Sequence, residues 1–166
     1  MAGMVLGHRE FGLAAALAAG AALGVALGAE YWGHLVPCAL CLWERWPYRI
    51  AIVLGIAVAF LPPLGVRMAQ ALLALTVLAG AALAAVHVGV ELHWWPSPLP
   101  ECMAPSLGSG SIAERLAHMP ATPAKPCDDP TYLIPGVPLS IAAMNLVFAS
   151  LFTAAAIWAL LRKPQP

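Results

Sequence analysis

Apolar residues gather into four long segments, which polar and proline-rich stretches separate. The segments run over about 11–31, 46–61, 66–90 and 139–161. A helix needs about 20 apolar residues to cross the hydrocarbon core of a bilayer, and the second segment reaches that length only if residues 40–45 extend it. The pattern predicts an all-α membrane protein, a four-transmembrane-helix bundle in which residues 1–166 form one integral-membrane domain.

Proline and glycine positions refine this picture. The proline pair at 62–63 cannot continue a helix, so it marks a tight link between the second and third segments. Pro47 predicts a kink or break inside the second. The first segment carries Gly20, Gly24 and Gly28 at four-residue spacing, which places three glycines on one helix face and favours close approach of another helix. We therefore interpret this segment as a retained, packed span rather than a cleaved signal peptide.

The composition agrees with a lipid-embedded protein. The chain is 61% hydrophobic and 10% charged, with a mean hydropathy of +0.83. A soluble domain normally has charges at about a quarter of its positions, so membrane lipid is the expected solvent for most of this surface. The formal net charge is zero, which leaves no basic surface for nucleic acid, and we expect no nucleic-acid partner.

The span count determines which loops share a side of the membrane. The first loop ends in Cys38 and Cys41, and the third, about 91–138, contains Cys102 and Cys127. With four spans these two loops face the same compartment. Basic residues divide evenly between the two sides, but those in short loops set orientation best, and this criterion places the termini in the cytoplasm. The cysteine loops then face an oxidising space, where disulfides persist.

The Cys-x-x-Cys of Cys38 and Cys41 suits reversible disulfide chemistry, because the two sulfurs can bridge with little backbone motion. A position at a helix start also favours the thiolate. Cys41 and Arg45 are four residues apart and share a helix face, so the guanidinium would stabilise a Cys41 thiolate and hydrogen-bond a bound ring. Two plainer interpretations stay open: a structural disulfide for the cysteines, and a side chain that reaches the headgroups for Arg45.

Zinc is the other use that cysteines of this number allow. Cys102 and Cys127 are isolated in the sequence, and no histidine stands beside either at ligand spacing. We therefore expect no metal site.

Polar residues near or inside the later spans have two interpretations. His87, Glu91 and His93 lie at the end of the third segment. They can relay protons or contact a cofactor ring, or they can form an interfacial polar cluster with water, which is the interpretation we favour. Asn145 is polar inside the fourth segment, and we expect it to hydrogen-bond another helix.

Two stretches carry a resemblance to a known family. They read Pro37-Cys38-Ala39-Leu40-Cys41-Leu42-Trp43-Glu44-Arg45 and Trp95-Pro96-Ser97-Pro98-Leu99-Pro100-Glu101-Cys102. The first resembles the first periplasmic loop of the DsbB family, bacterial membrane proteins that reoxidise the dithiol oxidase DsbA. The second resembles the entry to that family's second periplasmic loop. The resemblance covers nearly the whole chain, including the separation of the second cysteine pair.

The resemblance implies a role for each cysteine. Cys102 resembles the sulfur that the reduced oxidase attacks to form a mixed disulfide. Cys127 resembles the partner that is released and then attacks the first pair. Cys38 resembles the cysteine that bridges to Cys127, and Cys41 resembles the one whose thiolate contacts the quinone.

The same resemblance names candidate cofactor-binding residues. Arg45 matches the family's quinone-binding arginine, and Trp43 stands where the family has an aromatic residue. The family's histidine near the end of the third span falls at Gly89 here, with His87 and His93 on either side. Of these two we take His93 as the cofactor-binding candidate.

Together these features predict a membrane thiol:quinone oxidoreductase of the bacterial inner membrane. It would reoxidise a periplasmic DsbA-like oxidase of the thioredoxin fold and pass the electrons to the membrane quinone pool, as ubiquinone or menaquinone. One alternative is an enzyme similar to vitamin K epoxide reductase, although its Cys-x-x-Cys would be expected in the last span. Another is a non-catalytic membrane scaffold with structural disulfides.

Overall fold

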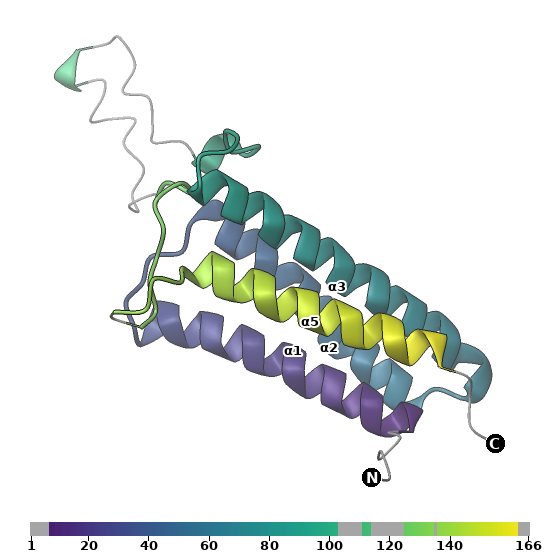
Figure 1. Ribbon diagram of the computed structural model, residues 1–166. Coiled ribbons are helices and arrows are strands. Elements are labelled where there is room, and N and C mark those ends of the chain that lie inside the picture. The colour runs from purple at the N-terminus through teal and green to yellow at the C-terminus, as the bar shows by residue number, and fades with distance from the viewer. Residues whose placement is uncertain (1–6, 103–110, 114–124, 135, 163–166) are drawn as a thin grey trace.

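The computed structural model describes residues 7–102, 111–113, 125–134 and 136–162. Figure 1 shows that the long helices of these residues lie side by side in one bundle. They are α1 (His8–Tyr31), α2 (Ala39–Phe60), α3 (Pro63–Glu91) and α5 (Ile141–Leu161), and a short 3-10 helix, η1 (Pro100–Cys102), follows α3. The predicted all-α four-helix architecture is confirmed.

The start of α1 and the end of α5 lie at one end of the bundle, together with the short link from α2 to α3 (Figure 1). The connections that follow α1 and α3 leave the opposite end, where both cysteine pairs lie. The prediction that the first and third loops share a side is therefore confirmed. Which side of the membrane that is stays a prediction.

The start of α2 lies before the predicted position. The helix begins at Ala39 rather than Trp46, because the N-cap residue Cys38 accepts a hydrogen bond from a backbone N–H of the first turn. Pro47 does not break the helix, which continues to Phe60. Its ring packs against Gly80 of α3, where an added Cβ would lie 3.0 Å from Pro47 Cβ.

Glycines bring α1 and α2 into close contact, but not the predicted ones. A Cβ at Gly12 would lie 2.6 Å from α2 backbone atoms, and one at Gly55 would lie 2.8 Å from α1 backbone atoms. Among the described residues, a Cβ at Gly20 or Gly24 would have no atom within 4 Å. A Cβ at Gly28 would meet only the side chain of Trp32, just after its own helix. The predicted glycine face is therefore wrong, because α1 and α2 cross nearer to the N-terminus of α1.

Apolar side chains occupy both the outer surface of the bundle and its core. Within the described part of the chain, three helices are long and apolar enough to cross a membrane: His8–Tyr31, Gly65–Glu91 and Ile141–Leu161. The fourth, α2, has 22 residues but carries three charged side chains in its first half. Small residues dominate the central core cluster and allow close helix packing: Ala15, Ala19, Ala51, Ala74 and Ala156. Large apolar side chains point outward on all four helices: Leu17, Val53, Met68, Leu75 and Leu151.

Candidate active site

Cys38 and Cys41 stand at the N-terminus of α2, with their Sγ atoms 3.0 Å apart. Cys38 is buried and caps the helix by accepting a 3.2 Å hydrogen bond from the Cys41 N–H. Hydrogen bonding from the Cys41 side chain, aided by that N–H, lowers the pKa of the Cys38 thiol despite its burial. The sulfurs are free thiols and need only a small movement to form a disulfide.

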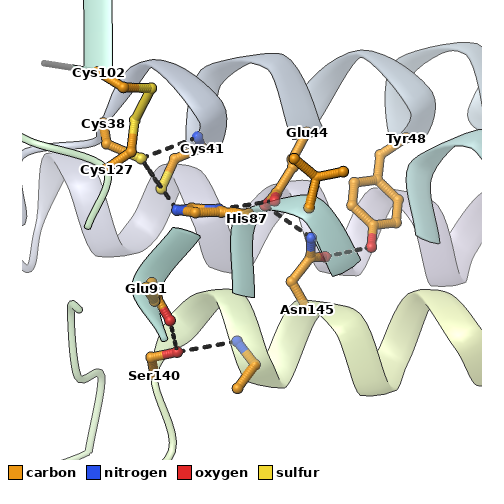
Figure 2. Close-up of polar contacts among 12 residues, drawn as sticks. Cys38, Cys41, Glu44, Tyr48, His87, Glu91, Cys102, Cys127, Ser140 and Asn145 are labelled. Carbon is orange, nitrogen blue, oxygen red and sulfur yellow. Dashed lines mark hydrogen bonds and ion pairs between the residues drawn. A yellow bond between two sulfur atoms is a disulfide. The ribbon is translucent and has the colours of Figure 1, made fainter. Parts of the chain in front are cut away.

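The second pair forms a disulfide between Cys102 and Cys127, at the end of η1 and in the segment before α5. A backbone hydrogen bond from Cys127 N–H to the Cys102 carbonyl joins the two segments. Both cysteines are buried in one apolar cluster with Cys38, Leu40 and Val90. The two pairs therefore lie against each other, as Figure 2 shows.

A histidine from α3 completes the surroundings of the first pair. His87 Nε2 lies 3.4 Å from Cys38 Sγ, and His87 Nδ1 lies 2.9 Å from Glu44 Oε1. All three side chains are buried. A carboxylate only accepts hydrogen bonds, so Nδ1 carries a proton, and in the neutral ring Nε2 presents its lone pair to Cys38. His87 is therefore placed to accept the thiol proton.

The polar chain continues through the bundle to α5 (Figure 2). Asn145 Nδ2 donates a 2.9 Å hydrogen bond to Glu44 Oε2, and the Tyr48 hydroxyl donates a 2.5 Å hydrogen bond to Asn145 Oδ1. The predicted helix-to-helix hydrogen bonding of Asn145 is confirmed. Both Glu44 oxygens have partners, as a buried carboxylate among apolar helices requires.

An apolar pocket of about 320 Å³ adjoins these hydrogen-bonded side chains. Its walls come from α1, α2, α5 and the connections at the cysteine end. Alanines and aliphatic side chains form most of it, and its polar members include Cys41, Glu44, Arg45 and Asn145. Val25 and Val36 line it and are exposed, so the pocket opens on the outer surface of the bundle. The volume falls in the range of ordinary ligand sites.

Arg45 points into the same pocket region as Cys41, as their shared helix face predicted. Its guanidinium contacts Glu30 of α1, with Nη1 and Oε2 2.5 Å apart. The contact is an ion pair without hydrogen-bond alignment, because Glu30 Oε2 has no aligned donor among the described residues. Arg45 Nε is likewise buried without a partner in that part of the chain, so it retains a donor for a ligand oxygen.

The structure separates the two remaining predicted cofactor residues from this pocket. Trp43 lies on α2 with 58% of its surface exposed and does not line the pocket. His93 follows α3 in a left-handed conformation, with φ of 57°. Its side chain is 72% exposed and lies 3.9 Å from Asp128. Both assignments stay predictions.

Sequence reasoning passed over Glu44 and gave His87 the plainer interfacial role. Helical spacing does place His87 and Glu91 on one face, but it does not say which helix that face meets. The signal was the Glu44-Arg45 pair, since two charges inside a membrane span normally require partners inside the bundle. Arg45 pairs with Glu30, and Glu44 pairs with His87.

The comparisons with known proteins agree with this arrangement. Residues 8–159 match the family model of the disulfide bond formation protein DsbB. A curated relative, the disulfide bond formation protein B of Herminiimonas arsenicoxydans, is 34% identical over 80 residues, which are 48% of this chain and 51% of that protein. The chain thus spans about half the length of the curated relative that it matches. No solved structure matches the chain.

Proposed function

Because the chain belongs to the DsbB family, whose members act in disulfide bond formation, we propose that it is a membrane thiol:quinone oxidoreductase. It oxidises the dithiol of a periplasmic DsbA-like protein of the thioredoxin fold and passes the electrons to a membrane quinone. One observation carries the proposal. The Cys38–Cys41 pair touches the buried second disulfide on one side and, through Cys41, an apolar pocket with an arginine on the other.

Electrons enter through the second pair. A thiolate of the partner attacks Cys102, which breaks the bond to Cys127 and forms a mixed disulfide. The partner's second thiol then displaces Cys102, so the partner leaves oxidised and Cys102 and Cys127 hold two electrons as thiols. Attack of Cys127 on Cys38 of a Cys38–Cys41 disulfide releases Cys41 as a thiolate and forms a Cys38–Cys127 disulfide. Attack of Cys102 on Cys127 then releases Cys38, which restores the second disulfide and leaves the two electrons on the first pair. A Cys102–Cys127 disulfide beside two free thiols supports this order.

The pocket fits the ring of a quinone. Its lining is mostly apolar, Cys41 stands in the wall, and Arg45 Nε is a buried donor that lacks a partner among the described residues. A quinone bound there would supply an acceptor for two electrons and two protons. Arg45 would hold a ring carbonyl oxygen, and Cys41 would be the thiol that faces the ring. Ubiquinone and menaquinone both satisfy this description.

His87 and Glu44 handle the proton of Cys38 in this proposal. His87 Nε2 accepts the thiol proton, and the Glu44 carboxylate stabilises the resulting imidazolium through Nδ1. The disulfide between Cys38 and Cys41 would then close as the quinone takes up the two electrons. Thiolate supply sets the rate of such exchanges, so this pair of residues supports turnover without touching the partner.

The location of the protein is part of the same proposal. The chain is a multi-pass membrane protein, with both cysteine pairs at one end of the bundle. We place it in the bacterial inner membrane with the cysteine end in the periplasm and both termini in the cytoplasm. This orientation brings the second pair to a soluble partner and leaves the pocket open to lipid.

The redox state of the partner in cells tests the proposal and separates it from a structural scaffold. In cells that depend on this protein, Cys41→Ser should leave the protein at its normal level in the membrane while the partner's dithiol accumulates reduced. Met68→Leu, on the lipid-facing surface of α3, serves as the control. A partner that stays oxidised with Cys41→Ser would refute the oxidase. Loss of the protein from the membrane would instead favour a scaffold with a structural role for Cys41.

A further inference from the structure

The first cysteine pair and His87 have the composition of a zinc site. Cys38 Sγ, Cys41 Sγ and a His87 ring nitrogen lie within 4.8 Å of one another. The sequence predicted no metal site, because Cys102 and Cys127 are isolated with no histidine at ligand spacing beside either. The fold brings in His87 from α3, 49 residues beyond Cys38. We infer that the reduced pair and His87 bind one Zn²⁺ ion, and that the disulfide form does not.

The distances are close to what zinc requires. Zinc binds thiolate sulfur at about 2.3 Å and imidazole nitrogen at about 2.0–2.1 Å in tetrahedral sites, which sets sulfur–sulfur separations near 3.8 Å. Cys38 Sγ and His87 Nε2 are 3.4 Å apart, and the two sulfurs are 3.0 Å apart. A rotation of the Cys41 side chain, which is only partly buried, suffices to open the second distance.

The second coordination shell is already in place. Histidines that bind metal almost always donate their other N–H to a carboxylate or a carbonyl, which fixes the ring and the tautomer. Glu44 holds His87 Nδ1 in this way, and Asn145 holds Glu44 in turn. The nitrogen that faces Cys38 is therefore the one with a free lone pair.

Charge balance and a route from the outer surface also favour binding of Zn²⁺ at this site. Two thiolates balance the charge of Zn²⁺, so the loaded site adds no net charge to a buried region. Binding to two thiols releases two protons to solvent. Cys41 lines the pocket that opens on the outer surface, which gives the ion a route inward and leaves the fourth coordination position on that side. Three protein ligands with one open position are typical of accessible zinc sites.

Zinc at this position would keep both sulfurs as thiolates and prevent the disulfide from closing. Metal binding and electron delivery from the first pair are therefore mutually exclusive. Metal binding can still be measured apart from the proposed activity, because it needs neither a partner protein nor a quinone.

Cobalt titration tests the site directly. The protein with Cys102→Ser and Cys127→Ser retains only Cys38 and Cys41 as cysteines. After reduction with a phosphine, it should bind one equivalent of Co²⁺, show sulfur-to-cobalt charge-transfer absorption, and release the Co²⁺ when Zn²⁺ is added. The oxidised form and Cys41→Ser should show no such absorption. His87→Ala should weaken binding at least tenfold, Glu44→Gln by about tenfold, and the exposed-residue control His93→Ala should not change it.

Two results would overturn the site: no bound Co²⁺ in a monodisperse, reduced sample, or equal affinity in His87→Ala. If the doubly substituted protein does not fold, alkylation of the reduced wild-type protein replaces the titration. One equivalent of Zn²⁺ should then slow alkylation of Cys38 and Cys41 at least tenfold, and unchanged rates would refute the proposal.

Discussion

His87 Nε2 lies 3.4 Å from Cys38 Sγ, although the two residues come from different helices and are 49 positions apart in the chain. Glu44 holds the opposite nitrogen of the ring. Cys38 thus lies beside a histidine whose orientation is fixed by a buried carboxylate, and in the proposed mechanism this histidine acts as its base. This relationship gives the first cysteine pair its own means of proton transfer.

Replacing His87 should slow the thiol chemistry. A positioned general base contributes about 10²–10⁴-fold to a rate, so His87→Ala should lower turnover of dithiol-dependent quinone reduction at neutral pH at least tenfold. His8→Ala, which replaces an exposed histidine at the start of α1, tests whether this loss is specific to the base. Equal losses in both variants would contradict the role of His87.

The lowered pKa of Cys38 predicts a reactive thiolate at moderate pH. Since the Cys41 side chain is the main cause, Cys41→Ala should raise the pH at which Cys38 becomes alkylated. With the native pair, half-maximal alkylation should occur below the ordinary thiol value of 9.0. The same shift makes the stability of the reduced protein depend on pH. The shift stabilises the folded protein fully above the ordinary thiol pKa, and this stabilisation is lost as pH falls through the lowered pKa of Cys38. A midpoint at or above 9.0 would count against the hydrogen-bonded thiolate.

Arg45 should act on quinone use rather than on partner docking. Removing a hydrogen bond from a charged donor costs about 1.5–3 kcal/mol, so Arg45→Ala should raise the half-saturating quinone concentration roughly 10–100-fold. The half-saturating concentration of the dithiol partner should stay unchanged, because the partner meets the other cysteine pair.

The same substitution also removes the ion-pair partner of Glu30. Adding Glu30→Gln to Arg45→Ala should therefore recover thermal stability without recovering quinone use. If the double variant regains quinone affinity, Arg45 acts only through packing and not as a ligand for the ring.

Close contact between α1 and α2 should make the bundle sensitive at Gly12. A Cβ there would approach α2 backbone atoms to 2.6 Å, and overpacking of this kind costs about 1–3 kcal/mol. Gly12→Ala should lower the free energy of unfolding in detergent by that amount. Gly20→Ala is the matched control, because a Cβ there meets no described atom within 4 Å. Equal stability of the two variants would contradict the observed crossing point.

The sequence predicted those features of the fold that local patterns of residues determine. Apolar segment length indicated four helices, and the span count placed Cys38 and Cys102 at the same end. It did not predict which faces of the helices meet, because that depends on how neighbouring helices are rotated. The glycine contact was therefore assigned to Gly20 instead of Gly12, and His87 was not matched to Cys38.

Dithiol-dependent quinone reduction by the purified protein tests the central claim most directly. Protein in detergent is mixed with a reduced DsbA-like oxidase and a quinone, and the quinone absorbance is followed with time. The account predicts steady turnover that vanishes with Cys41→Ser and with Cys102→Ser, because each cysteine pair carries one half of the relay. Normal turnover in the Cys41→Ser protein, or none in a well-folded wild-type sample with several quinones and donors, would contradict it.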